Sequence, residues 1–442
     1  MHPTPPPAAL IYGPPPPPPK RRWGRWVALG VVLTLVFCAG LVGLAVLVAN
    51  VLEDKPPVSA RSSGTPGPAR SPREGDPISV YQDWVREKVG ETLARQRESL
   101  LSGDEAGYLS VLDAQAAKAD RDRLAVQFKS LRAMKVADWH DKPSNPIRKD
   151  GDLWRIELDS SPCFVTDGCA DASALADTVW RVVGATATLV EWAPDDKEPH
   201  PWQTSELVAQ AGQRTIVATV KSQAGKLPSV LVQAEKAALV ADRFARDGKP
   251  PSRYVIYWAP KKEWERWFDW NPPEWSGGAA IEVSTDRYEL VLNADGLDPS
   301  AVDDLLRHEL THAASLPGRI AGGKELWWLT EGIAEIGEME GSPVSAHSGI
   351  QDVAAIAKDS DGLEVTGPSD NAANKAVSGL YAFAFLGARC ISERFGEPKL
   401  VEFFHAVVHD RRVASQAAPE VLDISWPDLQ RDCLAYIRQA AG

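Results

Sequence analysis

The sequence is poor in positive charge: 48 lysine and arginine residues stand against 60 aspartate and glutamate residues, a formal net charge of -12 over 442 residues. Proteins that bind nucleic acid usually carry a basic patch that matches the phosphates. The basic cluster at residues 20–25 lies beside an apolar run instead of on such a patch. We therefore expect no nucleic acid among the partners of this chain.

Cysteine is also scarce, with five residues in the chain. Cys38 lies inside the apolar run and leaves an even set of four, which suits an oxidising compartment. The simplest pairing is local and joins Cys163 to Cys169 and Cys390 to Cys433. Four cysteines allow three pairings, however, and free buried thiols are the alternative.

Charge is absent from Val27 to Leu52. Helical residues rise about 1.5 Å each, so this stretch spans roughly 39 Å, which is enough to cross a lipid bilayer. The sequence therefore predicts a single transmembrane helix over residues 27–52. A cleaved signal peptide is the alternative, but the run is longer than a signal peptide's apolar region and lacks a clear small-x-small cleavage site.

The flanks of this helix predict its orientation. Lys20, Arg21, Arg22 and Arg25 precede it, and basic residues favour the cytoplasmic side of a membrane. Residues 1–26 are then a proline-rich cytoplasmic tail, and residues 53–77, rich in Pro, Ser and Gly, are a flexible linker. We expect everything after the linker to lie outside the cell, anchored to its membrane.

Residues 78–222 begin with helical patterning and continue with strand-like runs at Trp154 to Leu158, Trp180 to Glu191 and Thr215 to Val220. Helices followed by a curved antiparallel sheet resemble the nuclear-transport-factor-2-like (NTF2-like) cone, particularly in the phrase "LLSGDEAGYLSVLD". The resemblance implies an α+β domain that acts as a spacer or as a pocket for recruiting substrate. Its core is expected to contain the tryptophans at 139, 154, 180, 192 and 202.

Residues 228–442 form a second predicted domain, and no internal repeat is evident. A helix, a strand (Tyr254 to Trp258) and a strand pair between Ile281 and Leu292 lead into a helix that carries "AVDDLLRHELTHAAS". Ser300 and Asp303 have capping-box spacing at the start of this helix, and Pro317-Gly318 ends it.

This helix carries the H-E-x-x-H arrangement. His308 and His312 are one turn apart on one face, where two imidazoles can bind the same metal ion. Glu309 points to the neighbouring side, where a carboxylate can hold the attacking water. A helix with two surface histidines is the alternative, but that alternative gives no reason for a third ligand at a fitting distance.

Such a ligand is present, because "ELWWLTEGIAE" places Glu331 after 18 intervening residues, on a helix expected to begin near Thr330. Here the chain resembles the gluzincin metallopeptidases, in the aminopeptidase-N and peptidase-MA-like branch. The resemblance implies one zinc ion per chain bound by His308, His312 and Glu331, with Glu309 as catalytic base. Metzincins are excluded, since they need Gly and His where this chain has Ser315 and Gly318.

Other site residues are weaker predictions. The segment "LYAFAFLGARCISERFGEPKL" resembles the family's tyrosine-led helix, which implies that Tyr381 stabilises the oxyanion; a buried tyrosine is the alternative. Glu335, one turn after Glu331, is expected either to orient a zinc-binding histidine or to be solvated. His405 and His409 lack a third ligand and are interpreted as surface histidines.

The strand near Ile281 to Leu292 is where this family lays an extended substrate. The aminopeptidase signature G-x-M-E-N is missing from "GGAAIEVSTD", which puts aminopeptidase activity in doubt and leaves endopeptidase activity open. The sequence thus predicts an α+β multidomain chain, with a transmembrane helix, an NTF2-like cone and a zincin-type domain, acting as a membrane-anchored extracellular zinc metallopeptidase on peptides or proteins. The alternative is an envelope binding or assembly module with a structural or inactive zinc site.

Overall fold

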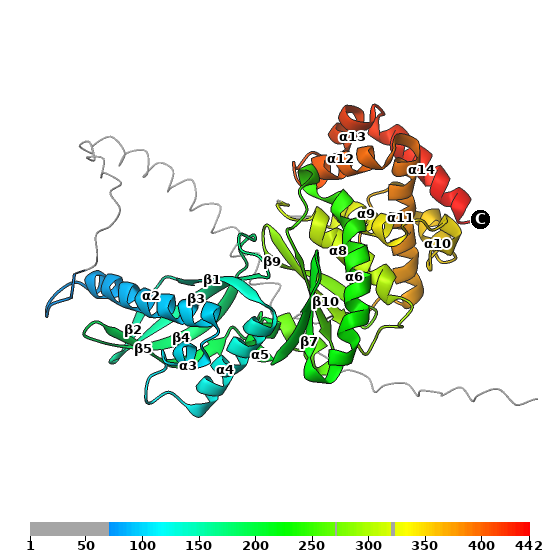
Figure 1. Cartoon of the computed structure of the whole chain (residues 1–442). Helices are drawn as coiled ribbons and strands as arrows, with labels where there is room; N and C mark the ends of the chain where they lie inside the picture. Colours follow the sequence, from blue (N-terminus) through cyan, green and yellow to red (C-terminus); the bar gives the residue numbers. More distant parts are fainter. Residues whose placement is uncertain (1–69, 270–271, 320–322) are drawn as a thin grey trace, which may run out of the picture. The chain divides into compact units, whose positions relative to one another are not determined.

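The computed structural model describes residues 70–269, 272–319 and 323–442 (Figure 1). Within these ranges, no helix is long and apolar enough to cross a membrane. The predicted transmembrane helix at 27–52 and the tail at 1–26 lie outside the described residues, as does most of the 53–77 linker. The membrane anchor therefore stays a prediction.

The N-terminal part of the described chain is built on an antiparallel sheet. Its strands follow the order β1-β3-β4-β5, and β2 pairs with β3. The run predicted from Trp180 to Glu191 is two strands, because the chain reverses at Gly184, which has a φ of +57°. The strands are β1 (Val136–Pro143), β2 (Arg148–Asp150), β3 (Leu153–Phe164), β4 (Ala174–Val183) and β5 (Thr186–Pro194).

Helices precede this sheet in the chain, as the sequence predicts. They are α2 (Ile78–Ser102), α3 (Glu105–Leu109) and α4 (Lys118–Ala133). Apolar residues of α2 and α4, among them Val89 and Phe128, belong to the same core cluster as the strands. The tryptophans predicted in this core are confirmed there, each at most 5% exposed: Trp139, Trp154, Trp180, Trp192 and Trp202.

A second sheet has the strand order β6-β7-β8-β10-β9. Strands β7, β8 and β10 are parallel, while β6 and β9 pair antiparallel at the two edges. The run Thr215 to Val220, predicted within 78–222, forms β7 of this second sheet. Four of its six residues are apolar and five are buried, so both faces are covered; this pattern predicts a central strand but not which sheet it joins. The strands are β6 (Leu207–Ala211), β7 (Thr215–Val220), β8 (Tyr254–Ala259), β9 (Gly278–Ser284) and β10 (Arg287–Asn293).

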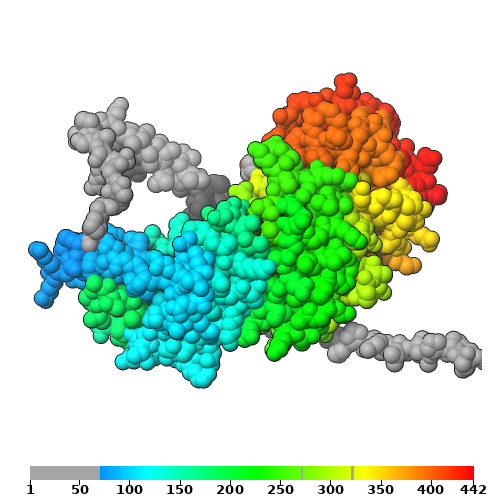
Figure 2. Space-filling view, viewed as in Figure 1, coloured from blue at the N-terminus to red at the C-terminus, as the bar shows by residue number. Residues whose placement is uncertain are grey.

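Helices cover one face of the second sheet. Both α6, which follows β7, and α8, which follows β10, pack against it in a core shared with the later helices. Val255, Tyr257 and Val291 point to the opposite face and belong to the core cluster of the N-terminal tryptophans. In the space-filling view the last helices form a contiguous block coloured orange to red (Figure 2). The helices are α5 (Pro201–Thr204), α6 (Leu227–Ala241), α7 (Lys261–Trp264), α8 (Val302–Ser315), α9 (Trp327–Glu338), α10 (Val353–Asp359), α11 (Asn374–Phe395), α12 (Glu397–Val408), α13 (Ala414–Leu422) and α14 (Trp426–Ala440).

Both predicted disulfides are formed. One joins Cys163, near the end of β3, to Cys169, and the other joins Cys390 on α11 to Cys433 on α14. The second bond therefore ties the C-terminal helix to the helix that carries Tyr381.

Candidate metal centre and active site

The helix that carries the motif, α8, begins at Val302 without a side-chain cap. The predicted capping box is wrong, because the amide and hydroxyl of Ser300 both donate to the carboxylate of Asp298, at 2.8 and 2.6 Å. The helix ends at Ser315, before Pro317, as predicted. Its apolar side packs into the core through Leu306 and Leu310, and His308 and Glu309 of the motif line a pocket on another side of the helix.

The structure brings together the three predicted ligands. The Nε2 atom of His312 lies 3.2 Å from Nε2 of His308 and 3.3 Å from Oε2 of Glu331, and His308 Nε2 is also 3.3 Å from that oxygen. Four tetrahedral ligands at about 2.0–2.1 Å from a zinc ion are about 3.3–3.4 Å apart. These residues therefore fit a zinc ion that would be held by His308, His312 and Glu331, with a fourth position left open.

Helix α9 positions Glu331 and begins at Trp327, one turn earlier than the predicted start near Thr330, because the apolar residues before Thr330 continue the helix into the core. The C-terminal end of α9 packs closely against α8. A Cβ atom on Gly337 would lie 2.2 Å from Oγ1 of Thr311, so only glycine allows this approach. Arg307 of α8 donates from Nε to the Glu338 carbonyl at 2.8 Å.

Two carboxylates lie behind His308. Its Nδ1 is 3.2 Å from Oε1 of Glu335, the residue predicted to orient a histidine, and 3.1 Å from Oε2 of Glu338, which the sequence analysis missed. Glu338 is one turn beyond Glu335 on the same helix, and that spacing is the signal that could have found it. His308, Glu335 and Glu338 are themselves close enough to form a second possible metal-binding group.

The charges around His308 favour a cation. Burial lowers the pKa of His308, but hydrogen bonds to Glu331, Glu335 and Glu338 outweigh burial and raise this pKa well above its ordinary value. The pKa of Glu331 is held far below its ordinary value, because the two histidines outweigh its burial. A divalent cation at Nε2 would take the place of the proton that these carboxylates attract.

Glu309 and Tyr381 line one pocket of about 500 Å³, together with Gly277 and Gly278 at the start of the edge strand β9. Burial raises the pKa of Glu309 above its ordinary value, against the effect of His308 and His312. A raised pKa suits a carboxylate that accepts and returns a proton near neutral pH.

Tyr381 lies on α11, with its ring centroid 6.0 Å from that of His308. Trp327 packs edge-on against it at 5.3 Å. Burial, followed by the nearby carboxylates, raises the pKa of Tyr381 well above its ordinary value. The phenol therefore keeps its proton and remains a hydrogen-bond donor toward the pocket.

A histidine absent from the predictions completes the cluster. His347 lies in the loop before α10, and its Nε2 is 2.7 Å from Oε2 of Glu335. The sequence analysis missed it because a single histidine in a Ser/Gly-containing loop has no spacing that points to a site.

The interpretation of His409 as a surface histidine is wrong. Its side chain is buried, and Nε2 lies 2.7 Å from the carbonyl of Ser315, at the end of α8. Burial lowers the pKa of His409, so the neutral ring donates this hydrogen bond. His409 directly follows α12, and its contacts to Ser315 and Phe404 bury it; the contact to Ser315 joins segments distant in sequence, which local patterning does not reveal. His405 is partly buried beside it.

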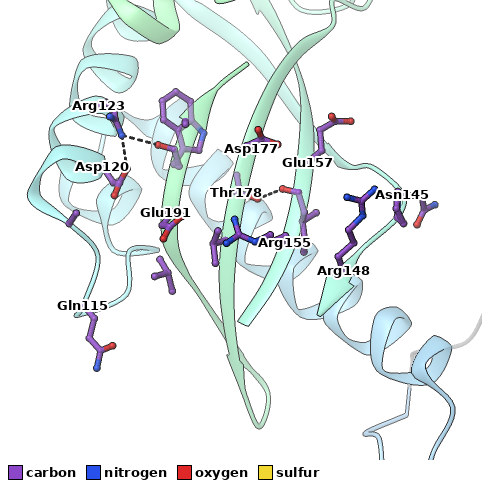
Figure 3. A pocket seen from close by; sticks show the side chains of 17 residues that line it. Gln115, Asp120, Arg123, Asn145, Arg148, Arg155, Glu157, Asp177, Thr178 and Glu191 are labelled. Carbon is purple, nitrogen blue, oxygen red and sulfur yellow. Dashed lines mark hydrogen bonds and ion pairs between the residues drawn. The ribbon is translucent and has the colours of Figure 1, made fainter. Parts of the chain in front are cut away.

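The N-terminal part holds a larger groove, of about 630 Å³, on its sheet (Figure 3). Arg123 pairs there with Asp120 at 2.8 Å and donates to the Trp192 carbonyl at 3.4 Å. Its lining mixes carboxylates and guanidinium groups and contains no histidine or cysteine. Among the described residues, the groups of His, Cys, Asp or Glu that are close enough together to hold a metal ion lie on α8 and α9.

No protein-family model matches the sequence, and no curated protein matches it. Solved structures similar to it include M1 zinc metallopeptidases and yeast LTA4 hydrolase. A mutant M1 zinc metallopeptidase from Deinococcus radiodurans has a TM-score of 0.35 and 15% identity, with 61% of each chain covered. Native yeast LTA4 hydrolase has a TM-score of 0.32 and 15% identity, covering 62% of this chain and 55% of that chain. This chain thus spans less than two thirds of their lengths, and the function proposed below rests on the geometry of the site.

Proposed function

We propose that this chain is a zinc metallopeptidase that hydrolyses peptide bonds with one zinc ion per chain. The observation that carries the proposal is the near-equilateral triangle of His308 Nε2, His312 Nε2 and Glu331 Oε2, beside a pocket lined by Glu309. A bound zinc ion would supply a Lewis acid that makes water acidic and polarises the scissile carbonyl.

Protein groups supply the proton transfers. Glu309 accepts the proton of the attacking water and then gives it to the leaving amine, so one carboxylate acts first as base and then as acid. Tyr381 donates a hydrogen bond to the oxygen that becomes negative in the transition state. Both side chains line the same pocket, and the raised pKa of each matches its role.

The substrate is a peptide or protein segment laid along β9. This strand is at the edge of its sheet, where main-chain groups can pair with an extended chain, and its first residues line the pocket. The segment Gly277 to Ile281 lacks the aminopeptidase signature G-x-M-E-N, and the carboxylate that lines the pocket beside this segment is Glu274. We expect cleavage within a polypeptide chain, which the positions of the cut sites in a peptide library test.

The proposed location is the outer face of a cell membrane, with the N-terminus cytoplasmic. The uncharged run at 27–52 and the basic residues before it support the anchor. Disulfides are typical of proteins outside the reducing cytoplasm, and the bonds Cys163–Cys169 and Cys390–Cys433 support the extracellular side. Residues 78–222 are proposed to form an NTF2-like domain that recruits substrate.

A binding or assembly module with an inactive zinc site is the second candidate. Its support is the large charged groove on the N-terminal sheet. The proposed metal ligands lie elsewhere, on α8 and α9. A purely structural zinc site has no use for Glu309, however, so this residue separates the two functions.

The test uses the full-length protein in detergent, its zinc content and a library of quenched peptides. Wild type should bind about one zinc ion and cleave, whereas Glu309→Gln should bind zinc equally well and cleave about 10²- to 10⁴-fold more slowly. Glu265→Gln, at an exposed glutamate outside the pocket, is the matched control and should behave as wild type. If zinc is bound and all three proteins are equally inert, the binding module is the better account.

A further inference from the structure

His347 has no role in the chemistry proposed above, yet its side chain is only 4% exposed and lies against Glu335, which is 5% exposed. A backbone amide defines its protonation pattern. Gly349 N–H donates to Nδ1 of His347 at 3.0 Å, so Nδ1 is the acceptor and carries no hydrogen. In the neutral ring, Nε2 then carries the hydrogen and donates it to Oε2 of Glu335 at 2.7 Å.

This bond leaves the other oxygen of Glu335 for the zinc site. Oε1 is 3.2 Å from Nδ1 of His308 and can accept its hydrogen. A histidine that donates from Nδ1 presents its Nε2 lone pair to a metal ion. The atoms therefore form one chain, from the Gly349 amide through His347, Glu335 and His308 to the proposed position of the metal.

A competing carboxylate makes the orientation of Glu335 important. Glu338 is 3.1 Å from the same Nδ1 of His308, but its side chain is 26% exposed and has no second histidine as a partner among the described residues. Glu335 is buried and held from both sides, so its oxygen stays in line with Nδ1. His347 is the group that fixes it there.

The loop around His347 is itself fixed to α11. The His347 ring stacks on Phe385, with centroids 5.0 Å apart and planes 14° apart. A Cβ atom on Gly349 would lie 2.0 Å from the Ser378 carbonyl, so only glycine allows this close approach. Phe385 is one turn from Tyr381, and the loop thus links the metal ligands to the helix of the proposed oxyanion donor.

We infer that His347 is a positioning residue of the zinc site: it holds Glu335, which holds His308 with Nε2 directed to the metal ion. The inference rests on the proposed zinc-binding function and adds a residue outside the ligand set. Loss of an outer hydrogen-bond partner typically lowers metal affinity about 10- to 100-fold, and we expect a loss in that range when the His347 donor is removed.

Two variants of the full-length protein separate hydrogen bonding from packing. His347→Phe keeps a ring to stack on Phe385 but removes the donor to Glu335. His347→Gln removes the ring but keeps an N–H group that can reach Glu335. His140→Phe is the control, since His140 is exposed on β1 of the N-terminal sheet. Zinc affinity is measured by competition with a chromophoric chelator, and the metal-free proteins are compared by thermal unfolding.

The expected result is a 10- to 100-fold loss of zinc affinity in His347→Phe, with most of it regained in His347→Gln and no change in the control. In a Glu335→Gln background, His347→Phe should lower zinc affinity little further, because the two residues act through one series of hydrogen bonds. Equal affinity in His347→Phe and wild type would overturn the inference and leave the proposed function intact. Equal losses in both His347 variants, matched by lower unfolding temperatures without zinc, would assign His347 to packing alone. A wild type that binds no zinc would overturn the zinc site itself.

Discussion

Two carboxyl groups, those of Asp141 on β1 and Glu335 on α9, are held in opposite ways. Asp141 accepts hydrogen bonds from the neutral groups Ser160 Oγ at 2.6 Å and Trp139 Nε1 at 2.5 Å, and burial nevertheless raises its pKa to about 6. Burial acts on Glu335 in the same direction, but His308 and His347 outweigh it and lower the pKa of Glu335. With neutral donors, burial raises the pKa of the acid, whereas the two histidines lower the pKa of Glu335 in spite of its burial.

The difference explains why the metal chemistry is expected in only one of the two regions. Around α8 and α9, ionised carboxylates and histidines form a cluster whose charge a divalent cation would balance. The two side chains that donate hydrogen bonds to Asp141, Trp139 and Ser160, are neutral, and Trp139 belongs to a tryptophan-rich core. The predictions below test this contrast, from the largest expected effect to the smallest.

Removal of a ligand should have the largest effect. Glu331→Ala deletes one corner of the triangle, and we expect zinc affinity to fall well beyond the roughly 100-fold that loss of an outer partner causes. Asp141→Asn, a change in the N-terminal sheet, should leave zinc affinity unchanged. Chelator competition measures both, and full zinc occupancy in Glu331→Ala would contradict the assigned ligand set.

A pair of tyrosines gives the next contrast. Tyr381→Phe removes the donor toward the pocket and should lower kcat about 10²- to 10³-fold at unchanged zinc content. Tyr108→Phe in the N-terminal core removes the hydrogen bond to Gln127, 2.8 Å long, and should cost about 1–3 kcal/mol of stability without changing kcat. Peptide cleavage and urea unfolding distinguish them; a Tyr381→Phe enzyme with normal kcat would place this residue in the core alone.

The pH dependence of stability should show the smallest effect. The pKa of Asp141 is about 6 in the folded state and 3.8 by reference, so between these values the folded state binds the extra proton. Its contribution therefore falls as pH rises from about 4 to 6, and between pH 4.5 and 7 the decrease is roughly 2 kcal/mol, or about 30-fold in the unfolding equilibrium. Urea unfolding at pH 4.5 and 7 should show a smaller decrease in Asp141→Asn than in wild type. Identical decreases would mean that Asp141 titrates normally.

Local spacing explains which parts of the site were predictable. The helical period places His308 and His312 on one face, and the family pattern supplies Glu331 at its distance along the chain. Glu335 followed from its position one turn later. The structure brings these residues together as the sequence analysis expected.

Long-range packing explains the rest. His347 joins the cluster because its loop contacts both α9, through Glu335, and α11, through Phe385, and His409 is held by the carbonyl at the end of α8. The sequence of β7 predicts a buried strand, but the parallel pairing of β7 with β8 depends on a crossover connection through α6. Such contacts join segments that no short window of sequence contains.

The most direct test of the account is the position of the metal ion. Crystals of the zinc-loaded protein, with anomalous diffraction recorded above the zinc absorption edge, would show it independently of activity. We predict one peak about 2.0–2.2 Å from His308 Nε2, His312 Nε2 and a Glu331 oxygen. A peak on the Nδ1 side of His308, between Glu335 and Glu338, or no peak near α8 would contradict the account.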